Sequence, residues 1–239
     1  MREKILAALK SSRADYTEIR LEESESTRVV FRGRNLETAG AVLDAGGIVR
    51  CLIKDRGWGI ATFNDLSDLI KSVDQAYQCA LQATTAEPIE LAPVPVTQKS
   101  ISASLQVDFR DVSLAEKKAL AEKYNQLVLN YSSKIINSAS SYADSFRRIT
   151  FATSEGTYIE HEIPMTAIVV QSIARDGDNV QTSYQTLSNQ VGFELAQGFE
   201  ETALKVAQRS LDLLKAETVT GGVYPVVIDQ ELAGVFIHE

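Results

Sequence analysis

Histidine and glutamate stand next to each other at His238-Glu239, behind the apolar residues Leu232, Val235 and Phe236. The spacing of those apolar residues is typical of one face of a helix. A His-Glu pair on a helix begins the metal motif of several zinc hydrolases, in which the imidazole binds the metal and the carboxylate acts as general base. We therefore single out His238 as a candidate metal ligand and Glu239 as a candidate catalytic residue.

The residues that lead to this pair predict how it is positioned. Gly221-Gly222 favours a turn, and the apolar run Val223–Ile228 follows it without polar alternation. Such a run is typical of a strand that is covered on both faces. Asp229 can act as N-cap of the helix that carries His238. We expect Val223–Ile228 to pair either with the sheet of the preceding residues or with a second copy of the chain, and we predict a dimer contact.

Other motifs point to no second site. His161-Glu162 precedes Pro164, and because proline breaks a helix, this pair fits a strand with cross-strand or solvent contacts. The acidic run Glu22–Glu25 is interpreted as a solvated turn, with metal binding as the alternative. The sequence has no glycine-rich phosphate loop, no CxxC pair and no GxSxG motif. With one usable histidine, the chain cannot assemble an ordinary histidine-rich zinc site on its own.

Composition narrows the class of protein. The 239 residues suffice for one large domain or two small ones, and 44% apolar and 23% charged residues are ordinary for a globular protein. A net charge of −8 argues against direct nucleic-acid binding. No segment reaches the ~18 apolar residues that a membrane helix needs. Cys51 and Cys79 lie in apolar contexts, which predicts buried free thiols and a reducing, cytoplasmic location.

Periodicity predicts an α+β fold with mixed or antiparallel sheets flanked by helices. Turns are expected at polar or glycine-bearing stretches such as Glu23–Ser26 and Ala45–Gly47. Ser113 and Glu116 form a capping box at the start of one helix. The predicted helices are 2–11, about 66–85, 113–131 and 200–216. The predicted strands are 15–22, 27–32, 36–43, 48–53, 58–63, 101–107, 134–142, 146–153, 157–161, 165–174 and 180–186.

The two halves of the chain show the same order of predicted elements. Each has a helix, two strands, a glycine-containing turn, two strands joined by a charged turn, and a helix. Three of the five prolines lie in Glu87–Lys99, which is the best candidate for a linker between halves 1–99 and 100–219. We hypothesise a duplicated helix–strands–helix unit whose strands share one sheet or stack as two layers.

Several segments together resemble the TldD/PmbA family of zinc metallopeptidases, which also carries the older description "modulator of DNA gyrase". The resemblance covers nearly the whole chain, in order. The segments are Ala14–Arg20, Gly47–Arg50 with Asp55–Ala61, Ser154–Gly156, and Gly222–Ile228 followed by Gly234–Glu239.

The resemblance implies roles for the terminal pair. His238 matches the first histidine of the family's HExxxH motif and Glu239 its catalytic glutamate, whereas the second histidine and a downstream cysteine ligand have no counterpart here. Neither Cys51 nor Cys79 matches that cysteine. In having this motif, the chain resembles TldD-type subunits, because PmbA/TldE-type subunits lack it. We expect 1–219 to be the N-terminal domain, 220–239 to begin the C-terminal metallopeptidase domain, and this chain to be inactive with no tightly bound zinc.

The family resemblance also implies substrates and partners. Peptides or unfolded protein segments are the expected substrates, zinc the expected cofactor of the full-length protein, and a homodimer or a heterodimer with a PmbA/TldE-like subunit the expected assembly. The N-terminal domain would then form a chamber wall, a partner interface, or an edge strand for an extended substrate. The alternative is a non-enzymatic scaffold or interaction module, as the gyrase-modulator description suggests.

Overall fold

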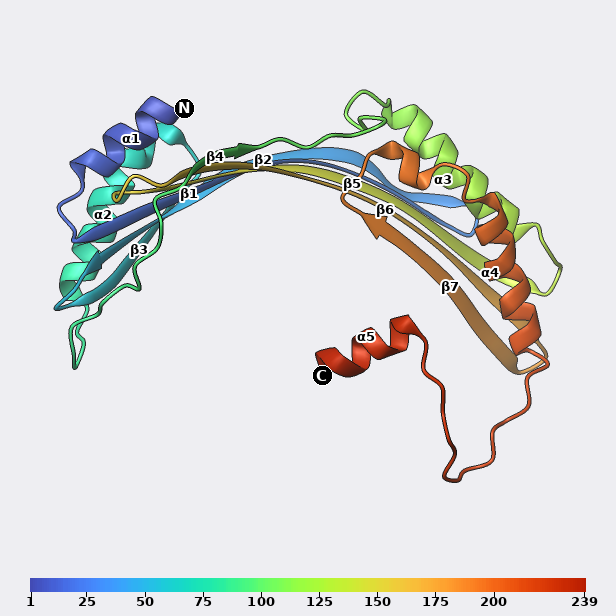
Figure 1. The fold of residues 1–239 in the computed structure, drawn as a ribbon. Helices are drawn as coiled ribbons and strands as arrows, with labels where there is room; N and C mark the ends of the chain where they lie inside the picture. Colours follow the sequence, from blue (N-terminus) through green and yellow to red (C-terminus); the bar gives the residue numbers. More distant parts are fainter.

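A computed structural model describes residues 1–239 and shows one seven-stranded sheet flanked by helices (Figure 1). This arrangement confirms the predicted α+β class. None of the helices is both long and apolar enough to cross a membrane. The strands are β1 (Tyr16–Arg32), β2 (Asn35–Ile53), β3 (Gly57–Phe63), β4 (Gln98–Ile101), β5 (Ile135–Thr153), β6 (Tyr158–Asp176) and β7 (Asn179–Asn189). The α-helices are α1 (Arg2–Ser11), α2 (Leu69–Gln82), α3 (Leu114–Leu129), α4 (Glu200–Leu213) and α5 (Gln230–His238), and short 3-10 turns occupy Leu66–Asp68 and Phe193–Ala196.

Two antiparallel meanders make up most of the sheet. Strands β1, β2 and β3 form the first, β5, β6 and β7 form the second, and the antiparallel pairing of β1 with β5 joins them. Strand β4 runs parallel to the first residues of β6. Each half therefore follows the order helix, three strands, helix, in one shared sheet, where the repeat hypothesis expected four strands in each half, and the duplication itself stays a prediction. The boundary between halves 1–99 and 100–219 stays a prediction.

One helix pair covers each end of the same sheet face. Along β1, Ile19 and Leu21 lie in the core under α1 and α2, whereas Val29 and Phe31 lie in the core under α3 and α4. All four positions are odd-numbered, and alternate residues of a strand share a face. Figure 1 shows the consequence: the sheet is an arch with one helix pair at each end and bare strands between them.

The bare middle of the sheet explains where the predicted strands were wrong. Strands β1 and β2 run without interruption for 17 and 19 residues, through the turns predicted at Glu23–Ser26 and Ala45–Gly47. Strands β5 and β6 likewise each replace two shorter predicted strands. Polar residues and glycines occur in the middle of these strands because no helix covers them there. They mark strand segments that are exposed to solvent, and not turns of the chain.

Three further predictions need correction. The strand predicted at 101–107 lies at 98–101, because the amide of Ala103 donates to the Glu162 carboxylate and does not extend the strand ladder. Cys51 is buried as predicted, but Cys79 is exposed, since Ala76 and Ala80 form the buried side of α2 there. The apolar run at 223–228 forms no strand and does not pair with the sheet.

Close backbone contact fixes the first helix pair on the sheet. A Cβ atom at Gly59 of β3 would lie 1.9 Å from the carbonyl oxygen of Ala76 in α2. Only glycine lets the strand and helix approach this closely. The sequence motif around Gly57 and Gly59 therefore has a packing role, and Trp58 between them packs edge-on against Tyr16 with 6.0 Å between ring centres.

Candidate functional site

The His-Glu pair lies at the carboxyl end of α5. Asp229 caps this helix as predicted, because its carboxylate accepts a hydrogen bond of 2.9 Å from the amide of Leu232. His238 is the last helical residue, and the amide of Glu239 donates to the carbonyl of Val235. Figure 1 shows α5 below the arch, at the end of a long connection that leaves α4. Both side chains are exposed to solvent.

Residues 1–239 contain no cluster of side chains typical of a metal site. No group of three or more histidine, cysteine, aspartate or glutamate side chains is close enough to hold a metal ion. A catalytic zinc ion commonly has three protein ligands. His161, the second histidine, lies within β6 opposite Ile149 of β5, in the predicted strand context. His238 and Glu239 thus have no third candidate ligand near them.

The residues around this pair are unusually exposed for apolar side chains. Phe236 and Ile237 are 74% and 84% exposed, and Val223 and Val227 are fully exposed. No residue of α5 is buried. Because isolated apolar side chains gain stability when they are removed from water, this segment has the character of a surface that another part of a protein covers.

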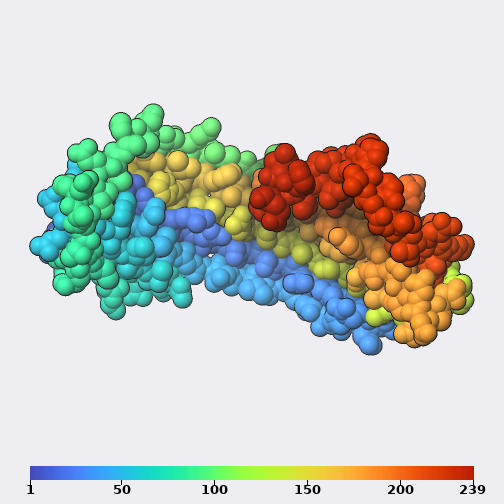
Figure 2. All heavy atoms as spheres, turned by 90° about the horizontal axis from the view of Figure 1, so that it is seen from below, coloured from blue at the N-terminus to red at the C-terminus, as the bar shows by residue number.

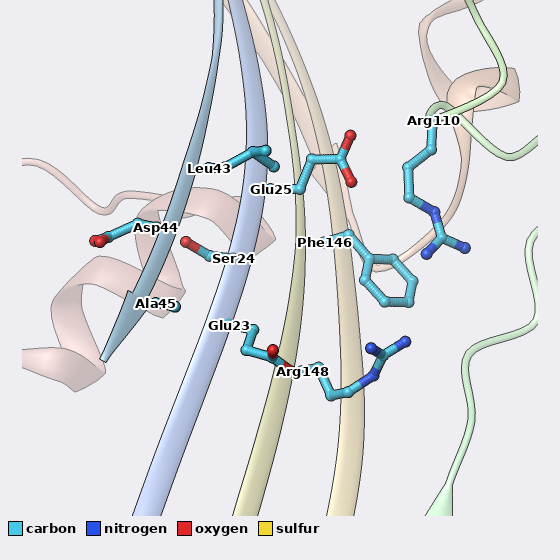
Figure 3. Close-up of a pocket in the computed structure, with 9 residues that line it drawn as sticks. All are labelled: Glu23, Ser24, Glu25, Leu43, Asp44, Ala45, Arg110, Phe146 and Arg148. Carbon is cyan, nitrogen blue, oxygen red and sulfur yellow. The ribbon is translucent and has the colours of Figure 1, made fainter. Parts of the chain in front are cut away.

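A second candidate site is a hollow between the two helix pairs, which we call the central hollow (Figure 3). Its volume is ≈ 350 Å³. Strands β1, β2 and β5 supply its floor, and Arg110 reaches over it from the connection between β4 and α3. The guanidinium of Arg110 lies 3.8 Å from the centre of the Phe146 ring. The lining residues are Glu23, Ser24, Glu25, Leu43, Asp44, Ala45, Arg110, Phe146 and Arg148.

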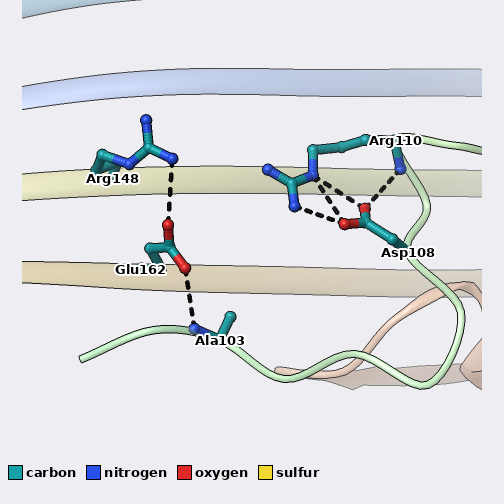
Figure 4. Close-up of polar contacts among 5 residues, drawn as sticks. All are labelled: Ala103, Asp108, Arg110, Arg148 and Glu162. Carbon is teal, nitrogen blue, oxygen red and sulfur yellow. Dashed lines mark hydrogen bonds and ion pairs between the residues drawn. The ribbon is translucent and has the colours of Figure 1, made fainter. Parts of the chain in front are cut away.

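Both arginines of the central hollow are already paired (Figure 4). Arg110 donates from Nε and Nη2 to the Asp108 carboxylate, with a shortest distance of 2.5 Å. These hydrogen bonds lower the pKa of Asp108 and raise the pKa of Arg110. Arg148 donates to Glu162 at 3.1 Å, and this cross-strand contact confirms the interpretation of the His161-Glu162 pair. The arginines therefore have little charge left for an anionic ligand.

Three carboxylates around the same hollow have no ion-pair partner; Glu23 and Glu25 point into it, whereas Asp44 points to the other face of the sheet (Figure 3). Glu23, Glu25 and Asp44 make no ion pair with any basic side chain of the chain. The central hollow is thus net acidic. Sequence reasoning assigned Glu22–Glu25 to a turn and missed this site, because the β1–β2 and β1–β5 registers bring its residues together and no local motif marks them.

The core of the second half contains a buried charged cluster. The ammonium of Lys117 in α3 lies 2.6 Å from the Asp144 carboxylate and 3.1 Å from the hydroxyl of Thr27. The Tyr142 hydroxyl also donates to Asp144, at 2.7 Å. Burial and the Asp144 charge raise the pKa of Tyr142. Because the ionic side chains are at most 5% exposed, this cluster ties α3 to β1 and β5 and offers no access to a ligand.

Comparison with known proteins places the chain in a family. The model of the PmbA/TldA metallopeptidase domain 1 matches residues 17–82, and the model of the PmbA/TldA metallopeptidase central domain matches residues 107–214. A metalloprotease of Synechocystis sp. is 37% identical over 229 residues, which are 95% of this chain and 49% of that relative. A metalloprotease of Methanocaldococcus jannaschii is 30% identical over 231 residues, which are 94% of this chain and 50% of that relative.

Solved structures share the fold. A Thermotoga maritima protein described as a proposed modulator of a DNA gyrase superposes with a TM-score of 0.75 at 15% identity, over 92% of this chain and 49% of that one. TldE from Thermococcus kodakarensis superposes with a TM-score of 0.67 at 14% identity, over 90% of this chain and 47% of that one. This chain thus spans about half the length of the curated relatives it matches. It is a member of the PmbA/TldD family and spans the family's domain 1 and central domain.

Proposed function

We propose that this chain is part of a TldD-type zinc metallopeptidase in which His238 is a metal ligand and Glu239 the general base. The observation that carries the proposal is the His-Glu pair at the end of the capped helix α5, in a chain whose relatives are named metalloproteases. A bound zinc ion supplies Lewis-acid polarisation and a more acidic water. The carboxylate of Glu239 can accept a proton, which is the part of the chemistry that this chain contributes.

We propose that the remaining metal ligands are supplied by residues other than 1–239. We propose that 1–219 form an N-terminal α+β domain, with halves 1–99 and 100–219, and that 220–239 begin a C-terminal metallopeptidase domain. The exposed side chains of Phe236 and Ile237 support this division, since they would pack in the core of such a domain. Peptides or unfolded protein segments are the proposed substrates.

The proposed assembly is a homodimer or a heterodimer with a TldE-like subunit. The likeness in fold to TldE supports a partner subunit that has the same fold as this chain. One relative is named a zinc metalloprotease TldD homolog. The exposed run at 223–228 is a candidate for part of the contact. A cytoplasmic location fits the two free thiols of Cys51 and Cys79.

A scaffold or interaction module is the second candidate function. Its support is the amount of apolar surface that α5 and the preceding segment leave uncovered. Under this reading the His-Glu pair has no chemical role. The two candidates predict opposite outcomes for substitution of His238 and Glu239.

Zinc content and cleavage of an unfolded protein test the proposal on the full-length protein. We expect His238→Ala to remove the zinc and the activity, and Glu239→Gln to keep the zinc but lower kcat by about 10²-fold or more. His161→Ala is the matched control, because this histidine lies in β6 far from the pair in sequence, and it should change neither quantity. Absence of stoichiometric zinc, or full activity of Glu239→Gln, would favour the scaffold.

The 239-residue chain alone provides a separate test of the incomplete site. We expect it to bind no zinc tightly and to cleave no unfolded protein. Hydrolysis that a chelator abolishes would show that this chain holds a complete site, and would contradict that part of the proposal.

A further inference from the structure

The first half of β2 has an open hydrogen-bonding edge. Strand β1 pairs with one side of β2 along its whole length, whereas β3 pairs with the other side only from Gly47 to Ile53. Residues 35–46 therefore have no neighbour on the outer side. Alternate residues of such an edge direct their amide and carbonyl groups outward, where another strand can pair with them. In Figure 2 the blue region that contains this segment forms one long border of the molecule.

From Thr38 to Gly46, little in the segment protects this edge from pairing. Natural edge strands are commonly blocked by lysine, proline, a bulge or a covering element. Residues 35–46 contain no lysine, arginine or proline. The one irregularity with β1, at the Val30/Phe31 step, leaves Glu37 without a partner residue between Leu36 and Thr38 and is confined to the start of the segment. Val42 and Leu43 are 62% and 78% exposed, on opposite faces of the strand, so a partner strand would gain apolar contact on both faces.

The charge around the edge selects the kind of strand that fits. Glu23 and Glu25 lie one strand in from the edge, opposite Ala45 and Leu43 in the β1–β2 register, whereas Asp44 on the edge itself lies opposite Ser24 and faces the other side of the sheet. The Glu23 and Glu25 carboxylates are unpaired and point into the central hollow. Strands lie about 4.8 Å apart, so a lysine or arginine on an added strand can reach them. Such basic side chains would stand at every second position, on the face that Leu43 and Ala45 share.

A second copy of this chain is a poor occupant of the same edge. Antiparallel self-pairing would bring another Glu37, Asp44, Glu23 and Glu25 to the contact, and like charges that face each other across strands are destabilising. We therefore infer that residues 35–46 of β2 bind a basic, extended segment of a partner protein by strand addition. This role goes beyond the proposed peptidase function, because it uses no part of the His238-Glu239 pair.

The outer edge of β7 offers an internal control. It is also the last strand on its side of the sheet, but residues 179–189 contain no charged side chain and α4 packs against this strand. A peptide held only by backbone hydrogen bonds would bind equally well at the edges of β2 and β7. Charge complementarity would favour β2 only.

Amide hydrogen exchange with two synthetic peptides tests the inference. The probes are a ten-residue peptide of alternating lysine and valine, and its counterpart with glutamate in place of lysine. With the full-length protein at low salt, we expect the lysine peptide to slow exchange within 35–46 at least tenfold and to leave 179–189 unchanged. The glutamate peptide should slow neither segment.

A variant separates the charge contribution from the backbone contribution. The combined substitution Glu23→Gln and Glu25→Gln removes the unpaired carboxylates of the central hollow, which lie at half-exposed and exposed positions. It should weaken binding of the lysine peptide about fivefold, since two cross-strand charge pairs of the usual strength add to that factor. The inference is overturned by equal protection from both peptides, by no protection, or by a concentration-dependent dimer that already protects 35–46.

Discussion

The two halves of the sheet follow the same path but finish it differently. In the first half, β3 has seven residues and pairs with the final third of β2. In the second half, β7 has 11 residues and pairs with β6 from Thr166 to Asp176, while β4 pairs with the start of β6. The second half therefore protects its middle strand almost completely, and the first half leaves residues 35–46 open. The two halves therefore have the same order of strands, but only the first half leaves a long strand edge unpaired.

The two cores also hold their helices in different ways. The first core combines apolar side chains with the close approach of α2 to β3 at Gly59 and with the buried Cys51 thiol, whose pKa is raised by burial. The second core surrounds the ion pair of Lys117 and Asp144. Backbone fit matters most in the first half, and satisfaction of a buried charge matters most in the second.

The largest expected loss of stability comes from removing the buried ion pair of the second half. Lys117→Met leaves the Asp144 carboxylate buried without its cation, which should lower the free energy of unfolding by about 3–5 kcal/mol. Urea unfolding measures the loss. Lys118→Met, at the next and exposed position of α3, is the control and should change stability by less than about 0.5 kcal/mol. A Lys117→Met protein within about 1 kcal/mol of the wild type would show that the ion pair does not anchor α3.

The next effect concerns the backbone contact of the first half. Gly59→Ala places a methyl group against the Ala76 carbonyl and should destabilise the protein by about 1–3 kcal/mol. Gly40→Ala is the matched strand control, because a Cβ there meets no atom within 4 Å. Amide exchange should speed up in α2 and β3 of Gly59→Ala and stay unchanged in α3 and α4. Uniform acceleration in both halves would contradict the separate roles of the two cores.

A smaller loss of stability is expected from removing the N-terminal cap of α3. Helix α3 has a complete capping box of Ser113 and Glu116, whereas α1 has no side-chain cap. Ser113→Ala should cost about 1 kcal/mol. Glu116→Gln keeps the reciprocal hydrogen bond in a neutral form and should cost less. Thermal unfolding of the two variants measures both losses, and equal losses would mean that the charge of Glu116 stabilises α3 as much as the hydrogen bond that the Ser113 hydroxyl accepts does.

The smallest expected effect depends on pH and concerns the first core, to which β6 of the second half contributes Tyr158. Burial is the main cause that raises the pKa of Tyr158 to about 12. The folded pKa lies above the unfolded value of about 10, so the contribution to stability is complete below pH ~10 and is lost as pH rises toward ~12. Between about pH 9 and about pH 11, Tyr158→Phe should lose roughly 1 kcal/mol less stability than the wild type. Parallel pH profiles from urea unfolding would refute this assignment.

Much of the local structure could be predicted from the sequence. Apolar spacing placed the four helices that pack on the sheet, and Asp229 marked the start of α5 correctly. These features depend on residues within a few positions of one another. The continuous strands did not follow from the sequence, because the same polar residues suit a turn and an uncovered strand, and only the position of the helix pairs decides between them.

The candidate sites divide in the same way. The His-Glu pair is adjacent in sequence and lies at a helix end, as expected. The central hollow takes Glu25, Arg110 and Arg148 from three distant segments. The register of β1 with β5 brings Glu25 and Arg148 together, and a one-residue shift would turn one of them to the opposite face, whereas Arg110 comes from the connection between β4 and α3. The site was therefore beyond reach of motif analysis.

The uninterrupted strands make this domain a rigid spacer. Strands β2, β5 and β6 each have 19 residues, and a strand of that length extends for about 60 Å at roughly 3.3 Å per residue. Because the same strands lie under both helix pairs, the pairs cannot move apart or swing about a linker without breaking the ladder between β1 and β5. Two partners that bind at the opposite ends of the arch would be held at a fixed separation and orientation.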